Sequence, residues 1–285
     1  MGCARLRGDG KRHSPLGSAG APASGDRRSA TMTARQLTVA TWNIGGGILG
    51  ASHQRTAVPS LSHHVCVLTT HQPDVICLQE AHEFGDRSGQ TQELAARAGF
   101  AHAVWYPVSP SHLVDGAQLA LGVLSRFPLR GFTFRSLPAP RLEATGPGGE
   151  PWVLHDKGYL VGRIQLPDGD VSLVNGHFFP LHRFGVSPAD PQFTPLCRQF
   201  TLDLLALSAA GPTLAGIDLN HSSPGEVLGE ALLPGRLTNA IADTPTTPDG
   251  SQRDYLLHDD LTRVLGTHVV PTRSDHFYCQ VSVLV

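Results

Sequence analysis

Apolar and polar residues alternate along most of the chain between residues 36 and 285, with the period of two that is typical of β-strands. Three segments differ, because their apolar residues recur every three or four positions and so indicate amphipathic helices. We predict strands over 36–43, 74–80, 101–106, 118–126, 129–137, 158–166, 170–178, 213–218, 253–257, 262–270 and 278–285, and helices over 60–72, 90–99 and 194–211.

Turn residues support these assignments. Asp168-Gly169 suits a tight turn and predicts that the two strands beside it form a β-hairpin. In the longest predicted helix, Pro195 suits the first turn, and Gly211 followed by proline ends the helix. The stretch 143–151 is rich in glycine and proline, and we predict a loop there rather than a linker between domains, because the rhythm of strands resumes unchanged after it.

Predicted strands outnumber predicted helices, and helices follow only some of the strands. This pattern favours an α/β (α+β) fold in which two mixed β-sheets pack as a sandwich with helices on the outside, a four-layer arrangement. The sequence contains no internal repeat. We therefore expect one domain over residues 32–285.

Residues 1–31 differ in composition, because Gly, Ser, Pro, Ala and Arg dominate and large apolar residues are scarce. Such a segment buries too little apolar surface to fold, so we predict a disordered or non-native N-terminal extension. It lacks the apolar core of a secretory signal, and its arginines give only a faint likeness to a transit peptide. We favour Met32 as the biological start.

Charge is unevenly distributed along the chain. The formal net charge is −2, yet the first 31 residues hold six basic and two acidic side chains, a surplus of four positive charges. The remainder therefore carries −6 and has no bulk attraction for a polyanion. A nucleic-acid substrate would need cations or a local basic patch to offset this repulsion, whereas a small substrate would not.

Cysteine usage and hydropathy indicate the compartment. The five cysteines are odd in number and form no CxxC pair, which argues against a disulfide framework or zinc knuckle and favours a reducing environment. No apolar run approaches the roughly 20 residues that span a bilayer. We expect a cytoplasmic protein without a membrane span, and a monomer.

Side chains suited to binding a metal ion or a phosphate recur where the predicted strands end. Taken singly, each has an ordinary explanation, such as a turn, a solvated strand end or a surface ion pair. Taken together, carboxylates, amides and imidazoles all fall at strand ends, where loops carry function more often than the framework does. The set comprises Asn43, Glu80, His177, Asp218, Asn220, Asp254, Asp275 and His276.

Seven motifs follow one another along the chain, namely TWNIGGG, PDVICLQE, LGVLSR, NGHF, GIDLN, RDYLL and SDHF. In this order they resemble the exonuclease/endonuclease/phosphatase superfamily, the fold of pancreatic-type deoxyribonuclease and of apurinic endonucleases. The resemblance covers residues 37–285 and implies that 32–285 is an endonuclease/exonuclease/phosphatase-like catalytic domain. Three positions depart from the family pattern: Gly176 stands where threonine is usual, Ile217 where glycine is usual, and Arg253 where an apolar residue is usual.

The chemistry of a phosphate ester defines what such a site needs. Phosphoryl oxygens have to be neutralised, water activated and the leaving oxygen stabilised. Mg²⁺ is typically held by one or two carboxylates together with water and substrate phosphate. Glu80 suits the principal ligand of Mg²⁺ or Mn²⁺, and Asn43 suits a neutral ligand or a donor to phosphate. The resemblance implies that Asp275 holds the same ion or a second one.

His276 suits a general base or a phosphate-binding cation, and the resemblance implies that Asp254 fixes its tautomer. The resemblance also implies that Asp218 orients or deprotonates the attacking water, that Asn220 donates to a phosphoryl oxygen and that His177 binds the phosphate. Together these roles describe a metal-dependent hydrolase of phosphate esters. The sequence leaves open which group is the base, because coupled groups resist single assignments.

The identity of the substrate is open at this point. Lys157, the only lysine after residue 31, precedes a predicted strand in the motif HDKGYL and fits a phosphate contact as well as a solvated position. This motif is similar to the sphingomyelinase-like and inositol-phosphatase branches of the superfamily. The loop 178–185 is aromatic and basic, and suits stacking on a base or contact with a lipid. Nucleic acid and a phospholipid headgroup or inositol phosphate both stay candidates.

Two other functional classes compete with this interpretation. One is a non-catalytic binding module that retains the fold, but all the expected types of site residue are present in this chain. The other is a zinc hydrolase, which is disfavoured because the fifteen histidines include no HExxH spacing. His63 and His64 lie on a predicted helix, away from the strand ends.

Overall fold

The computed structural model describes residues 35–50, 59–85 and 88–285, which belong to the unit Thr33–Val285. The predicted extension 1–31 lies outside the described residues, and so does Met32. The described residues form two six-stranded mixed sheets accompanied by helices, which confirms the predicted fold class.

The first sheet has the strand order β13-β14-β1-β2-β4-β3. At its centre β1 runs parallel to β2 and antiparallel to β14. The parallel pair brings both carboxyl ends to one edge, where Asn43 pairs with Gln79 beside Glu80. The strands are β1 (Gln36–Asn43), β2 (Val75–Glu83), β3 (His102–Pro110), β4 (Gln118–Ser125), β13 (Arg263–Val270) and β14 (Tyr278–Leu284).

The second sheet has the strand order β11-β12-β10-β9-β8-β5. Asp218 on β10 pairs with His177 on the parallel strand β9 and with Asp254 on the antiparallel strand β12. Three of the predicted site residues are therefore direct neighbours at one edge. The strands are β5 (Leu129–Leu137), β8 (Lys157–Leu166), β9 (Gly169–His177), β10 (Thr213–Asp218), β11 (Thr238–Asn239) and β12 (Asp254–His258).

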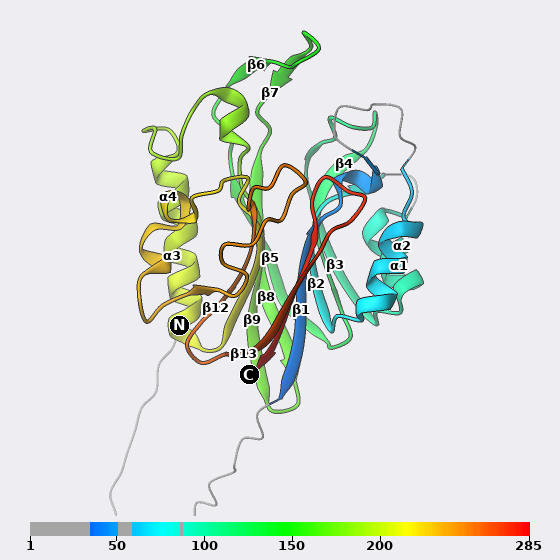
Figure 1. Cartoon of the computed structure of the whole chain (residues 1–285), viewed down its shortest axis with the longest axis vertical. Coiled ribbons are helices and arrows are strands. Elements are labelled where there is room, and N and C mark those ends of the chain that lie inside the picture. Colours follow the sequence, from blue (N-terminus) through cyan, green and yellow to red (C-terminus); the bar gives the residue numbers. More distant parts are fainter. Residues whose placement is uncertain (1–34, 51–58, 86–87) are drawn as a thin grey trace, which may run out of the picture. The chain divides into compact units, whose positions relative to one another are not determined.

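The prediction of a loop over 143–151 is wrong, because β6 (Glu143–Thr145) and β7 (Pro151–Val153) form a two-stranded hairpin. The hairpin closes through a bond from the Gly146 amide to the Glu150 carbonyl at 2.7 Å, with Gly149 in the left-handed region at φ 82°. Figure 1 shows this hairpin beyond the ends of the two large sheets.

The two sheets pack face to face through apolar side chains that alternate with those of their outer faces. Val39, Val75, Leu173 and Leu214 are at most 1% exposed in this inter-sheet core. Helices α1 and α2 cover the outer face of the first sheet, and α3 and α4 cover that of the second (Figure 1). The helices are α1 (Ser62–His71), α2 (Gln90–Ala98), α3 (Thr194–Ala210) and α4 (Pro224–Leu228), with 3₁₀ helices η1 (Gly45–Gly47), η2 (Leu181–Phe184) and η3 (Gly229–Leu232).

Two further expectations concern membrane spans and disulfides. Over the ranges that the structure describes, no helix is long and apolar enough to cross a membrane. The four cysteines in those ranges are all free, which agrees with the predicted lack of a disulfide framework. They are Cys66, Cys77, Cys197 and Cys279.

Candidate active site

Glu80 reaches the site from a β-bulge. The sequence predicts a strand that ends at Glu80, but β2 continues to Glu83, and its pairing with β4 shifts register between Leu78 and Ala81. Glu80 adopts a left-handed φ of 55°, which costs free energy for any residue other than glycine and is found preferentially at functional sites. Its Oε1 lies 3.6 Å from Nε2 of His177, on the other sheet.

A donor cluster from the second sheet faces Glu80. Nζ of Lys157 lies 3.1 Å from Nε2 of His177 and 3.8 Å from Oε1 of Glu80. Nδ2 of Asn220 lies 3.0 Å from the same imidazole nitrogen and donates to the Phe178 carbonyl at 3.1 Å. Because the ammonium and the amide both donate, Nε2 of His177 is the acceptor. Burial and the charge of Lys157 hold the pKa of His177 well below its usual value, so this ring is neutral.

His276 and Asp254 form a buried pair on the other side of Asp218. Nδ1 of His276 lies 2.9 Å from Oδ2 of Asp254, and its Nε2 lies 3.8 Å from Oδ2 of Asp218. The backbone carbonyl of His276 accepts from Trp42 Nε1 at 3.2 Å and from Thr272 at 2.7 Å, so the backbone that carries the ring is held by two hydrogen bonds. Burial lowers the pKa of His276, but Asp254 and Asp218 outweigh it and raise that pKa well above the usual value.

The carboxylates of Glu80 and Asp218, which lie nearest the centre of the site, differ in charge state. Burial acts to raise the pKa of Glu80, yet electrostatic interactions, first with Lys157 and then with the nearby histidines, outweigh it and lower the pKa to about 2. Burial also raises the pKa of Asp218, and here the neighbouring Asp254 adds to it, so that the value is about 6 despite His276. Glu80 is therefore a permanent anion at neutral pH, whereas Asp218 titrates close to it.

Asn43 ties the two sheets together at this edge. Its Nδ2 donates to Oδ2 of Asp218 at 2.9 Å, and its Oδ1 accepts from the Gly45 amide at 2.9 Å. Asp275 stands beside the same turn: its Oδ1 accepts from the Ser274 hydroxyl at 3.3 Å, and a Cβ added at Gly45 would lie 3.2 Å from it. The structure thus brings all eight strand-end residues and Lys157 to one edge of the sandwich.

These residues fit a hard divalent cation, because carboxylate and amide oxygens dominate the donor set. One oxygen also lacks a partner: Oδ1 of Asp254 is buried and makes no hydrogen bond. Atoms of Asp218, Asp254 and His276 lie within 4.8 Å of one another and make a possible metal site. The sequence instead predicts ligands at Asn43, Glu80 and Asp275, and it assigns that triad to proton transfer.

Several contributors to the site have no signal in the sequence. His112, in the loop after β3, acts electrostatically on Glu80 and His177, and Arg183 on η2 acts on Lys157. The Arg183 guanidinium also lies over the Trp152 ring of β7, 5.3 Å from its centroid. Nothing in their spacing marks these residues, because their neighbours come from distant segments.

The predicted role of the loop 178–185 is corrected at its aromatic residues. Phe178 and Phe179 are 0% exposed and pack in the core beneath α3. They therefore cannot stack on a base or enter a lipid surface. His182 and Arg183 of the same loop are exposed, and a contact between them and the substrate stays a prediction.

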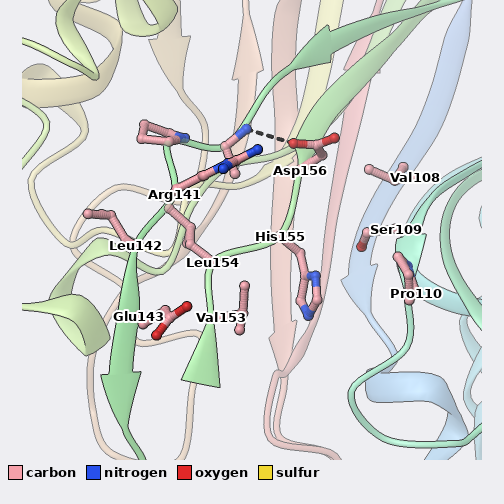
Figure 2. Close-up of a pocket in the computed structure, with 12 residues that line it drawn as sticks. Val108, Ser109, Pro110, Arg141, Leu142, Glu143, Val153, Leu154, His155 and Asp156 are labelled. Atoms are coloured by element: carbon pink, nitrogen blue, oxygen red, sulfur yellow. Dashed lines mark hydrogen bonds between the residues drawn. The ribbon is translucent and has the colours of Figure 1, made fainter. Parts of the chain in front are cut away.

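A cavity of about 390 Å³ lies between the end of β3 and the β6–β7 hairpin. Figure 2 shows the His155 ring directed into the space between Val153 and Pro110. Asp156 lines the same cavity and accepts from the Ala139 amide at 2.7 Å. Because His155 and Asp156 directly precede Lys157, the cavity borders the donor cluster along the chain. The other lining residues are Val108, Ser109, Pro140, Arg141, Leu142, Glu143 and Leu154.

Comparisons with known proteins agree with this arrangement. The family described as Endonuclease/Exonuclease/phosphatase family matches residues 40–276. No curated protein matches the sequence.

Solved structures show the same fold at low identity. An endonuclease/exonuclease/phosphatase from Beutenbergia cavernae has a TM-score of 0.65 at 20% identity, over 88% of this chain and 72% of that one. The human Nocturnin catalytic domain with bound sulfate has a TM-score of 0.60 at 16% identity, over 88% and 95%. A mannosyl-6-phosphatase from Bacteroides thetaiotaomicron has a TM-score of 0.59 at 15% identity, over 87% and 100%.

Proposed function

The chain belongs to the endonuclease/exonuclease/phosphatase family, and from this premise we propose that it is a divalent-cation-dependent phosphoesterase that cleaves a phosphate ester by attack of water. One observation carries the proposal. An ionised, partly buried carboxylate, Glu80, faces the donors Lys157 and Asn220, which converge on the neutral ring of His177, while a second carboxylate with a pKa of about 6, Asp218, stands beside a charged imidazole. Phosphoryl transfer to water needs both kinds of group: charged and donor groups that hold a cation and the phosphate, and a carboxylate that accepts a proton from water.

The donor cluster binds the phosphate. Lys157 supplies positive charge, and Asn220 supplies a neutral donor whose backbone is fixed by a bond from its own amide to Oδ1 of Asp218 at 2.8 Å. Because the group is buried, these donors act in a low dielectric and stabilise the charge that develops on the phosphoryl oxygens. His276, held as a cation by Asp254, adds a second positive group on the opposite side.

Asp218 is the base in this proposal. A pKa of about 6 lets it be ionised at neutral pH and still accept a proton effectively. The proton of the attacking water passes to Asp218 as the water oxygen bonds to phosphorus, and the leaving oxygen departs as its bond to phosphorus breaks. His276, with its raised pKa, serves as a cation next to Asp218 rather than as the base.

Glu80 holds the cation in this proposal, assisted by Asn43 and Asp275. When bound, Mg²⁺ or Mn²⁺ neutralises phosphoryl oxygens and acts as a Lewis acid. Glu80 suits this role because its pKa of about 2 keeps it ionised at every physiological pH. Without the cation, Glu80 would repel an incoming phosphate, since both are anions.

For the substrate we propose a small phosphate ester, such as an inositol phosphate, a lipid headgroup or a sugar phosphate. The −6 charge outside the first 31 residues disfavours a polyanion. A cavity of about 390 Å³, lined by His155 and Asp156 just before Lys157 in the sequence, has the size of a site for a small ligand. The mannosyl-6-phosphatase with a similar fold supports this class, whereas the buried Phe178 and Phe179 remove one argument for a nucleic acid and one for a lipid surface.

Hydrolysis assays test the proposal. Release of nitrophenol from bis-p-nitrophenyl phosphate and p-nitrophenyl phosphate is measured in Mg²⁺, in Mn²⁺ and after removal of metal. Glu80→Gln is expected to lower kcat by at least about 10²-fold, whereas Glu93→Gln, which changes an exposed glutamate on α2, serves as the control. Full activity of metal-free protein contradicts the proposed cation, and no hydrolysis of any ester favours the binding module.

The substrate class needs its own comparison. Sugar phosphates, inositol phosphates, sphingomyelin vesicles, plasmid DNA and single-stranded DNA are offered under the same conditions. We expect the highest kcat/KM with one of the small esters. Plasmid or single strands as the best substrates would overturn the choice of class while leaving the phosphoesterase assignment in place.

A further inference from the structure

Three polar side chains lie between the two sheets, directly behind the site. Asn175 of β9, Gln79 of β2 and Thr41 of β1 are each 0% exposed. Gln79 Nε2 donates to Oδ1 of Asn175 at 2.9 Å and to the Thr41 hydroxyl at 3.0 Å. Burying such groups costs free energy unless they are hydrogen-bonded, and here the bond from Gln79 to Asn175 crosses from one sheet to the other.

The side-chain amide of Asn175 donates hydrogen bonds to the backbone at the bulge in the first sheet. Its Nδ2 donates to the carbonyl of Leu78 at 3.0 Å and to the carbonyl of Gly122 at 2.8 Å. Leu78 and Gly122 are the last regular pair of β2 and β4 before the register shift. Asn175 therefore contacts the backbone where the bulge begins, two residues before Glu80.

Asn175 also stands two residues before His177 on its own strand. One side chain thus joins the backbone that carries Glu80 to the backbone that carries His177, and these two residues meet at 3.6 Å. We propose that Asn175 is a positioning residue: its amide holds the bulge against the second sheet and so sets where the Glu80 carboxylate stands relative to Lys157 and His177. This inference rests on the proposed role of Glu80 as the ligand of the cation.

The strained backbone at Glu80 explains why a positioning residue is needed. A glutamate with φ 55° keeps that conformation only when its surroundings hold it there. The Gln79 bond to Oδ1 fixes which way the Asn175 amide faces, so that both of its N–H groups point at the two carbonyls. A leucine of similar size would fill the space but would remove the donor that Asn175 supplies to those carbonyls.

Binding of Mn²⁺, followed by electron paramagnetic resonance, tests this role together with kcat and KM for bis-p-nitrophenyl phosphate. Wild type and Glu80→Gln come first, because a wild type that binds no Mn²⁺, or a Glu80→Gln variant that binds it equally well, contradicts the proposed function itself. Asn175→Leu is then expected to weaken Mn²⁺ binding by about 10- to 100-fold, the range for residues that orient a metal ligand. It should lower kcat by a similar factor, with KM for the ester changed far less.

Thr201→Val is the matched control, since Thr201 is also buried and donates to the Leu228 carbonyl at 2.9 Å, but on α3. It should lower the melting temperature without changing Mn²⁺ affinity or kcat. If Asn175→Leu behaves in the same way, Asn175 is merely structural and the inference is wrong. If Asn175→Leu does not fold, Asn175→Ser, whose vacated space water can fill, decides between the two outcomes by the same Mn²⁺ and kcat measurements.

Discussion

Replacing Asp254 by asparagine tests the buried pair that it forms with His276. The change keeps the shape of the side chain and removes its charge. At the observed 2.9 Å, a carboxylate attracts an imidazolium by about 6 kcal/mol when the effective dielectric constant is about 20. If roughly half of that attraction acts on the transition state, kcat falls by about 10²-fold. His276→Ala should cost at least as much, and the double variant little more than either single one.

The pH dependence of stability gives a second measure of the same pair. The pKa of His276 in the folded protein is raised well above its usual value. The resulting stability is fully present below about pH 6.5 and is lost as the pH rises through the folded-state pKa. In Asp254→Asn the pKa of His276 moves back toward its usual value. The melting temperature of the variant should therefore fall much less between neutral and alkaline pH than that of the wild type.

The assay combines kcat for the two single variants and the double variant with melting curves across pH. Asp260→Asn, which removes an exposed carboxylate a few residues further along, controls for the loss of one negative charge. If the factors by which Asp254→Asn and His276→Ala lower kcat simply multiply in the double variant, the argument is refuted. When two groups act as one unit, removing the second lowers kcat little once the first is gone.

Three other predictions follow from the electrostatics of the site. Lys157→Met keeps the buried stem but removes the charge next to His177, so KM for the phosphate ester should rise at least about tenfold; an unchanged KM excludes the phosphate contact. Asp275→Asn should raise the Mg²⁺ concentration needed for half-maximal activity and be partly rescued by Mn²⁺, and indifference to metal concentration removes Asp275 from the cation site. Because Asp218 has a pKa of about 6 and acts as the base when ionised, kcat/KM should rise with pH through about 6, and a profile that is flat there contradicts its role.

Regular segments were predictable because their pattern is local. The alternation in β1 and β9 fixes which side chains face the core, and the Asp168-Gly169 turn fixes the register of β8 with β9. That register pairs Gly158 with His177 and so brings Lys157 to the end of β9, but it does not fix the direction of the Lys157 side chain. Residue type and position at strand ends were enough to find the remaining members of the site.

Features that depend on distant segments were not predictable. The stretch LQEAHE carries no mark of a bulge, since the shift at Glu80 is held by the Asn175 amide from the other sheet. The contributions of His112 and Arg183 likewise depend on loops that meet only after folding. The β6–β7 hairpin was missed because strands of three residues show too little alternation, and glycine-rich turns dominate the local pattern.

The contacts that define the site join one residue from each sheet. Asn43 bonds to Asp218, Glu80 faces His177, and the imidazole–carboxylate pair links the segment before β14 to β12. Neither sheet alone carries a complete set of anion, phosphate donors and base. The apolar core between the sheets therefore has a catalytic consequence, because it sets the separation of the two halves to within the few tenths of an ångström that hydrogen bonds tolerate. The polar trio behind the site, like the bond from Asn43 to Asp218, adds directional hydrogen bonds that set this separation, which is why the fully buried Asn175 affects the position of the catalytic groups.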